Sequence, residues 1–122
     1  LKSPSGGPLV QHSLSALLTS FHKNRISLEK IIEKACHNPS ILFDIKDRGF
    51  IREGFFADLV IIDLEKNYSV KKTDILYKCG WSPFENETFK GIVEKTFVNG
   101  HLAYDKGKIS TKIAGKALAF KR

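Results

Sequence analysis

The sequence has 122 residues, of which 42% are hydrophobic and 27% charged, a composition typical of one globular domain and unlike that of disordered, collagen-like or disulfide-rich chains. No stretch reaches the roughly 18 consecutive apolar residues of a membrane helix, so we expect a soluble protein. The 20 Lys and Arg residues outnumber the 13 Asp and Glu residues and give a formal charge of +7. This excess leaves nucleic-acid binding open, although many basic residues have acidic neighbours, which favours an ordinary solvated surface.

The first part of the chain predicts a loop followed by helices. Residues 3–8 read Ser-Pro-Ser-Gly-Gly-Pro, and this glycine and proline content indicates a loop. A helix over residues 10–21 is predicted by apolar residues at three- and four-residue spacing: Leu14, Leu17, Leu18 and Phe21. Ser27 is a suitable N-cap for a second helix, which Asn38-Pro39 should end, and Pro39 can then open another short helical turn.

After Gly49 the sequence favours strands. Three runs have high strand propensity: Phe50-Ile51, Ala57–Ile62 and Tyr68–Val70. Gly54 and Asp63 lie between them and are expected to separate the strands. Asn99-Gly100 lies between the strand-like runs 93–98 and 101–104, which indicates a tight hairpin. The basic segment 112–122 is predicted either to add an edge strand or to trail in solvent. These elements together predict an α+β fold.

The sequence shows no cluster of metal ligands. A metal site needs several His, Cys, Asp or Glu side chains that converge on one ion, and close pairs such as His-x-His usually announce it. The histidines are isolated, and we interpret each as a surface or packed imidazole: His12, His22, His37 and His101. Cys36 and Cys79 stand outside any CxxC arrangement, which favours reduced thiols and a cytoplasmic setting. Asp58, at the start of a predicted strand, is interpreted as a capping or turn residue.

The Ser5-Gly6-Gly7 loop is chemically more suggestive. Glycine lets backbone N–H groups approach a bound carboxylate closely just before a helix begins. An ordinary loop-to-helix connection explains the same residues, so both interpretations stay open.

Several strings, taken in order, resemble the C-terminal third of dihydroorotases, a branch of the amidohydrolase superfamily. Residues 38–61, with Gly-Phe-Ile-Arg-Glu-Gly and Ala-Asp-Leu-Val-Ile, resemble a run that dihydroorotases share with hydantoinases and deacetylases. Residues 78–85, Lys-Cys-Gly-Trp-Ser-Pro-Phe-Glu, and residues 96–100, Thr-Phe-Val-Asn-Gly, are closer to dihydroorotases and allantoinases. Residues 3–11 are similar to the loop after the last catalytic strand, and Gly-Lys-Ala at 115–117 is similar to the family's common ending.

The resemblance implies the C-terminal portion of a zinc-dependent dihydroorotase, which interconverts dihydroorotate and N-carbamoyl-L-aspartate in pyrimidine biosynthesis. In that family a (β/α)₈ barrel holds zinc through residues that would all precede Leu1, and the sequence has no initiating Met. Residues 1–48 are therefore expected to complete the last barrel helices, and residues 49–122 to form strands of the accessory β-sandwich and a tail. No catalytic or metal-binding residue is expected in this piece, which alone should be inactive.

Carried over residue by residue, only Ser5 and Gly6 match the family's substrate loop, with Gly7 and Pro8 as neighbours. Relatives often have a bulky residue where Ser5 stands, which leaves a backbone contact as the expected one. The partners implied are a small-molecule substrate and the missing barrel, without which the piece should self-associate. Two alternatives stay open: a fragment of an allantoinase or another cyclic-amide hydrolase, and a free-standing basic module that binds nucleic acid.

Overall fold

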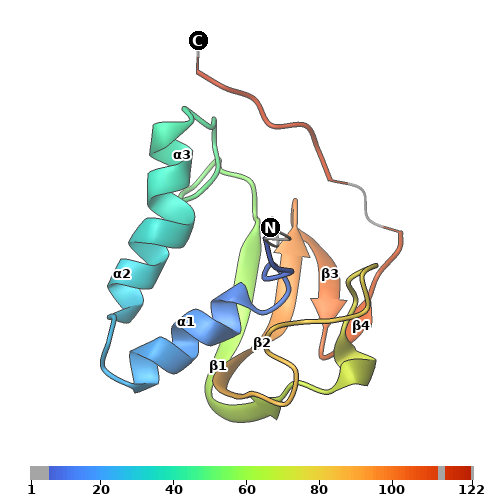
Figure 1. The fold of residues 1–122 in the computed structure, drawn as a ribbon. Helices are drawn as coiled ribbons and strands as arrows, with labels where there is room; N and C mark the ends of the chain where they lie inside the picture. The colour runs from blue at the N-terminus through green and yellow to red at the C-terminus, as the bar shows by residue number, and fades with distance from the viewer. Residues whose placement is uncertain (1–5, 113–114, 122) are drawn as a thin grey trace, which may run out of the picture. The chain divides into compact units, whose positions relative to one another are not determined.

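The structure, a computed structural model, describes residues 6–112 and 115–121 and has an α+β architecture, as expected. Helical elements come first and strands second (Figure 1). In chain order the elements are α1 Ser13–His22, α2 Leu28–Ile32, the π-helical turn η1 Glu33–His37, α3 Asn38–Leu42, β1 Leu59–Ser69, the 3-10 turn η2 Lys72–Asp74, β2 Thr88–Val98, β3 His101–Asp105 and β4 Lys108–Ile109. The strands form one four-stranded sheet in the order β1-β2-β3-β4, with β3 antiparallel to both of its neighbours. Among the described residues, no helix combines the length and hydrophobicity of a membrane span.

The chain divides into two compact units, each built from two separate stretches. The first unit comprises Leu1–Arg25 and Asp63–Ile92, and the second comprises Ile26–Ile62 and Val93–Arg122. Strands β1 and β2 contribute residues to both units. The expected division of the sequence at residues 48 and 49 stays a prediction.

In the first unit, α1 packs against β2 at a glycine. Leu18, on the predicted apolar face of the helix, is 1% exposed. A Cβ atom added at Gly91 would lie 2.7 Å from the Leu18 Cβ, and Gly91 has a φ of +93°. The Thr19 hydroxyl accepts a hydrogen bond from the Lys90 N–H at 2.9 Å. Only glycine therefore lets this helix approach the strand so closely.

Helix α1 begins at Ser13, three residues later than the apolar periodicity predicts. The His12 N–H donates to the Leu9 carbonyl in a turn, at 3.1 Å. The Gln11 N–H donates instead to the Tyr77 hydroxyl, at 2.6 Å. The Val10 carbonyl accepts from the Ser13 hydroxyl at 3.1 Å, and residues 10–12 form a turn before α1.

The second unit opens with a helical run that is longer than the sequence predicts. Ser27 caps α2 as expected, because its hydroxyl accepts from the Lys30 N–H at 3.2 Å. The prediction that Asn38-Pro39 ends this helix is wrong. The Asn38 N–H donates to the Glu33 carbonyl in the π-helical turn, and α3 follows directly with its proline in the first turn. Proline has no N–H to donate, so it fits in this first turn without losing a hydrogen bond.

Two predictions for the strands need correction. Strand β1 runs without interruption from Leu59 to Ser69, so Asp63 does not end a strand; its carboxylate accepts from the N–H groups of Glu65 and Lys66 within β1. Phe50-Ile51 is not a strand. The Phe50 ring stacks on His37 at 4.4 Å between centroids, in a loop bounded by glycines with positive φ angles.

The predicted hairpin is confirmed. Val98 pairs with His101, and Asn99 and Gly100 have φ angles of 50° and 82°, both positive as in a two-residue type I′ turn. A second two-residue turn, Lys106-Gly107, joins β3 to β4 and was not predicted.

The C-terminal segment makes an isolated antiparallel bridge, between Phe120 and Ile45. Two backbone hydrogen bonds of 2.8 Å support it, from Lys46 N–H to the Ala119 carbonyl and from Lys121 N–H to the Asp44 carbonyl. Apart from this bridge, the described residues 115–121 have no regular secondary structure and are exposed, so they do not add an edge strand to the sheet. Ile113, which belongs to the predicted segment, lies outside the described residues.

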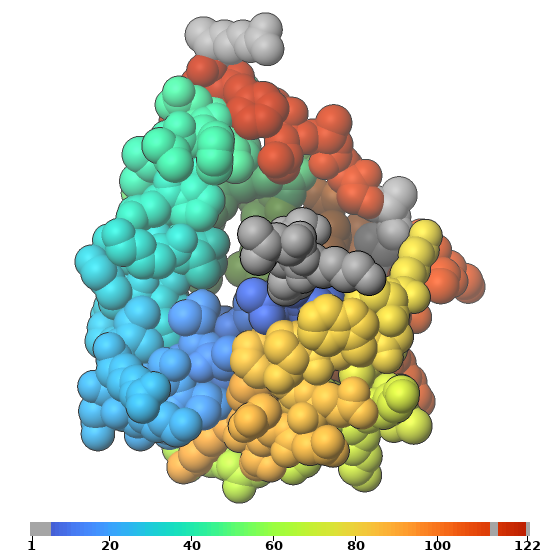
Figure 2. All heavy atoms as spheres, viewed as in Figure 1, coloured from blue at the N-terminus to red at the C-terminus, as the bar shows by residue number. Residues whose placement is uncertain are grey.

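Many apolar side chains of the second unit are exposed. The run from α2 to α3, which Figure 2 shows in cyan to green as a continuous surface, carries Ile32, Ile41, Leu42 and Phe43, with exposed fractions of 48%, 63%, 74% and 61%. The start of β1 adds Leu59, Val60 and Ile61. Apolar surface of this extent is typical of faces that pack against further protein.

Candidate functional site

The glycine loop of the first unit is open to a ligand. Ser5, its first predicted residue, lies outside the described residues. Gly6 and Gly7 are exposed, and no described atom beyond their chain neighbours lies within 4 Å of a Cβ placed on either. Pro8 is half-buried. The backbone of both glycines is therefore accessible, while their role in substrate binding stays a prediction.

Gln11, just after this loop, is held on three sides. Its side-chain Nε2 donates to the Asp74 carbonyl at 2.6 Å, and its Oε1 accepts from the Leu76 N–H at 2.9 Å. Its own backbone N–H donates to the Tyr77 hydroxyl at 2.6 Å. The side-chain amide thus pairs with residues 74–76 much as a neighbouring strand would. Gln11 belongs to the string that resembles the family loop, but its residue type alone gives no signal for these contacts.

His12 is buried in an aromatic box. The side chain is 2% exposed, and four rings lie around it with centroids 6.1–6.4 Å away: Tyr68, Tyr77, Phe84 and Phe89. Its Nδ1 lies 3.4 Å from the Ser82 hydroxyl, whereas its Nε2 finds no hydrogen-bond partner among the described residues. Burial lowers the pKa of His12, against a smaller raising effect of the Asp74 charge. His12 is therefore a packed, neutral imidazole at neutral pH, which confirms that interpretation for this residue.

The remaining histidines do not converge. His22 Nε2 contacts the Leu64 carbonyl at 2.7 Å, His37 stacks on Phe50, and His101 is exposed on β3. Across residues 6–112 and 115–121, no group of three or more His, Cys, Asp or Glu side chains is placed to hold a metal ion. The described residues therefore do not offer a ligand set that fits zinc.

Asp58 is used structurally, as the sequence suggested. Its carboxylate pairs with Arg48 and accepts a hydrogen bond from the Asn99 N–H at 2.8 Å. Arg48 also donates to the Asn99 side-chain oxygen at 3.0 Å and lies over the Phe56 ring, 4.1 Å from its centroid. This network fixes the start of β1 to the Asn-Gly turn of the second unit, which leaves the carboxylate no free role in acid-base chemistry.

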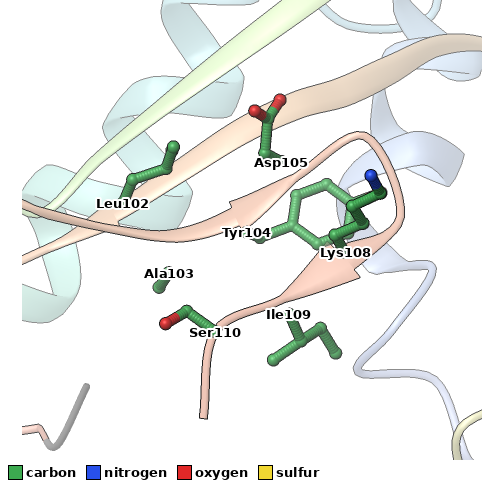
Figure 3. A pocket seen from close by; sticks show the side chains of 7 residues that line it. All are labelled: Leu102, Ala103, Tyr104, Asp105, Lys108, Ile109 and Ser110. Atoms are coloured by element: carbon green, nitrogen blue, oxygen red, sulfur yellow. The ribbon is translucent and has the colours of Figure 1, made fainter. Parts of the chain in front are cut away.

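Two hollows lie on the surface of the described residues. One, of about 190 Å³ on the β3–β4 hairpin, is lined by the residues labelled in Figure 3. Its carboxylate, Asp105, has a pKa lowered by the hydrogen bond and charge of Lys95, whose Nζ lies 2.8 Å away. The other, of about 330 Å³, lies between α1 and residues 83–89 of the first unit and carries Lys23 and Arg25.

Comparisons with known proteins agree on one family. Residues 9–103 match the model of the amidohydrolase family. The chain is 34% identical over 109 residues to an allantoinase of Desulfitobacterium hafniense, covering 88% of the chain and 24% of that protein. It is 30% identical over 117 residues to a dihydroorotase of Pyrococcus furiosus, covering 96% of the chain and 28% of that protein. Among solved structures, an L-hydantoinase from Arthrobacter aurescens superposes with a TM-score of 0.81 at 32% identity, over 90% of this chain and 25% of the other. The chain thus spans about a quarter of the length of these relatives.

Proposed function

Because this chain belongs to the amidohydrolase family, we propose that it is the C-terminal portion of a longer dihydroorotase that interconverts dihydroorotate and N-carbamoyl-L-aspartate in pyrimidine biosynthesis. The observation that supports this most directly is the 30% identity to the Pyrococcus furiosus dihydroorotase over 96% of the chain. Since the described residues do not fit zinc, we propose that residues outside this chain bind the metal, and we assign no chemical step to it. The cytoplasmic setting belongs to the same proposal, supported by Cys36 and Cys79, both free and exposed thiols.

In this proposal the glycine loop binds the carboxylate of the substrate. Gly6 and Gly7 are exposed, no described atom beyond their chain neighbours lies within 4 Å of a Cβ placed on either, and they precede α1 by a short turn. Backbone N–H groups of this kind bind anions without requiring a particular side chain. The exposed apolar faces of the second unit would pack against the rest of the (β/α)₈ barrel, because the relatives have about three times as much additional chain.

An allantoinase is the second candidate, favoured by the 34% identity to the Desulfitobacterium hafniense enzyme. The two enzymes act on different cyclic amides, so turnover separates them. The complete gene product, purified with zinc, should be offered dihydroorotate, allantoin and hydantoin under the same conditions. We expect turnover of dihydroorotate, in both directions. Turnover of allantoin alone would establish the second candidate, and turnover of none of the three would refute both.

The isolated chain provides a separate test of the apolar faces. If they normally contact further protein, the chain alone should self-associate, because burying apolar surface stabilises by about 25 cal/mol per Å². Sedimentation at several concentrations measures this. A monomer that melts cooperatively would contradict the proposal that this chain is a portion of a larger fold.

A further inference from the structure

We propose that Gln11 and Tyr77 are positioning residues that set the place of the Gly6-Gly7 backbone for the substrate carboxylate. This inference rests on the proposed function and deepens it. It assigns to the segment Asp74–Tyr77, which is remote in sequence, control over how the glycine loop binds substrate. The hydrogen bonds that carry it all lie within the first unit.

The first step is that burial does not fix the loop. Gly6 and Gly7 are exposed, and the apolar side chains that follow, Leu9 and Val10, are 47% and 86% exposed. Such a segment gains little from the hydrophobic effect, which scales with the apolar area removed from water. Its position must therefore come from hydrogen bonds made by its neighbours.

The second step is that Gln11 supplies those hydrogen bonds and fixes its own orientation. Its side chain donates to the Asp74 carbonyl and accepts from the Leu76 N–H, so pairing with this segment requires a side chain that has both a donor and an acceptor. Only an amide offers both at this length, whereas a carboxylate cannot donate. The Tyr77 hydroxyl accepts the Gln11 backbone N–H at 2.6 Å, which also fixes the main chain.

The third step connects this attachment to the glycines. After Gln11 in the chain, the His12 N–H donates to the Leu9 carbonyl in a turn, and the His12 ring is buried. Before Gln11, Pro8 has a φ angle fixed by its ring. Pro8 and the turn at Leu9–His12 thus restrict the described chain between the glycines and α1, so the attachment of Gln11 limits where Gly6 and Gly7 can lie. Loss of the Tyr77 or Gln11 hydrogen bonds would let the glycine N–H groups move away from the carboxylate.

The test uses the complete gene product with Tyr77→Phe and Gln11→Met. Tyr77→Phe removes one hydrogen bond and Gln11→Met removes the two made by the side-chain amide, and neither change adds a charge near the loop. We expect KM for dihydroorotate to rise about three- to tenfold with kcat nearly unchanged, because the carboxylate is bound equally in the ground state and transition state. The inhibition constant of orotate, which has the carboxylate, should rise in parallel, while that of uracil, which lacks it, should not change. A role in folding alone would not distinguish these two inhibitors.

Ser69→Ala is the matched control. It removes a hydrogen bond of 2.8 Å to Thr88 in the same unit, remote in sequence from the loop, and should leave KM and both inhibition constants unchanged. Gly6→Pro removes an N–H of the loop itself and cannot adopt the Gly6 φ of +154°, so it should raise KM directly. If the unmodified protein does not turn over dihydroorotate, the proposed function fails. If it does, and Gly6→Pro raises KM while Tyr77→Phe only lowers the melting temperature, the loop role stands and the positioning role is overturned.

Discussion

Two glycines of the second unit, Gly49 and Gly54, allow the steric part of a mutation to be separated from its backbone part. Their φ angles are nearly equal, +82° and +81°. No described atom beyond the chain neighbours lies within 4 Å of a Cβ added at Gly54. A Cβ added at Gly49 would lie against the Ser40 Cβ, 2.7 Å from the Cys36 carbonyl oxygen and 3.0 Å from the Ser40 hydroxyl. Alanine at each position therefore has the same backbone strain, and only Gly49→Ala adds a clash.

The magnitudes follow from this geometry. Holding an alanine at a positive φ costs about 1–2 kcal/mol in either variant. Overpacking at Gly49 adds about 1–3 kcal/mol, because the atoms that must move are backbone and a Cβ atom, with no flexible side-chain end among them. Ser40 is only 6% exposed, and its hydroxyl donates to the Arg48 carbonyl at 2.7 Å, a hydrogen bond worth about 1 kcal/mol that the clash would disturb. We expect Gly49→Ala to lower the free energy of unfolding by about 2–5 kcal/mol, and Gly54→Ala by about 1–2 kcal/mol.

Equilibrium urea denaturation of the purified protein and both variants measures this difference. The midpoint should fall further for Gly49→Ala, while the dependence on urea concentration stays the same in all three proteins. If the two alanine variants lose equal free energy, then Gly49 is not packed against Ser40 and Cys36. The packing of the loop onto η1 and α3 would then be wrong.

Three further predictions concern His12, Arg48 and Gly91. The pKa of His12 is lowered in the folded state, so the stability that its neutral form contributes is complete above the ordinary pKa of 6.5. This stability is lost as the pH falls toward the lower folded-state pKa. Denaturation curves recorded across that pH range should therefore show a smaller dependence of stability on pH for His12→Phe. Arg48→Ala leaves the Asp58 carboxylate without its cation and should cost about 1–3 kcal/mol in thermal denaturation, whereas an unchanged melting temperature would show that the pair is dispensable. Gly91→Ala places a Cβ atom 2.7 Å from the Leu18 Cβ and should destabilise the first unit by about 2–4 kcal/mol. Gly107→Ala is the control, because a Cβ there meets no described atom within 4 Å, and its urea midpoint should fall less.

The elements that could be predicted from sequence are those determined by neighbouring residues. Asn99-Gly100 specifies its turn because both residues adopt positive φ angles easily, and Ser27 specifies a helix start because its hydroxyl reaches an N–H three residues away. The Lys106-Gly107 turn has the same geometry and was missed, because lysine adopts a positive φ at a cost and gives no local signal for it.

The features that escaped prediction depend on contacts between distant residues. Gln11 and Asp74 are 63 positions apart, and neither residue type indicates a partner. Likewise, the Gln11 N–H donates to the Tyr77 hydroxyl, 66 positions away along the chain. The periodicity of a helix reports which face is apolar, but it does not report which donors are taken by tertiary contacts.

In this chain, the residues expected to determine stability differ from those expected to determine substrate binding. Gly91 and Gly49 lie where elements pack closely, so their substitution should change the free energy of unfolding. Gln11 and Tyr77 hold a loop that buries little apolar surface, so their substitution should change the position of the loop more than the stability of the unit. If the glycine loop binds substrate as we propose, effects on KM and effects on unfolding should come from different residues, and a variant such as Tyr77→Phe should affect the first with little change in the second.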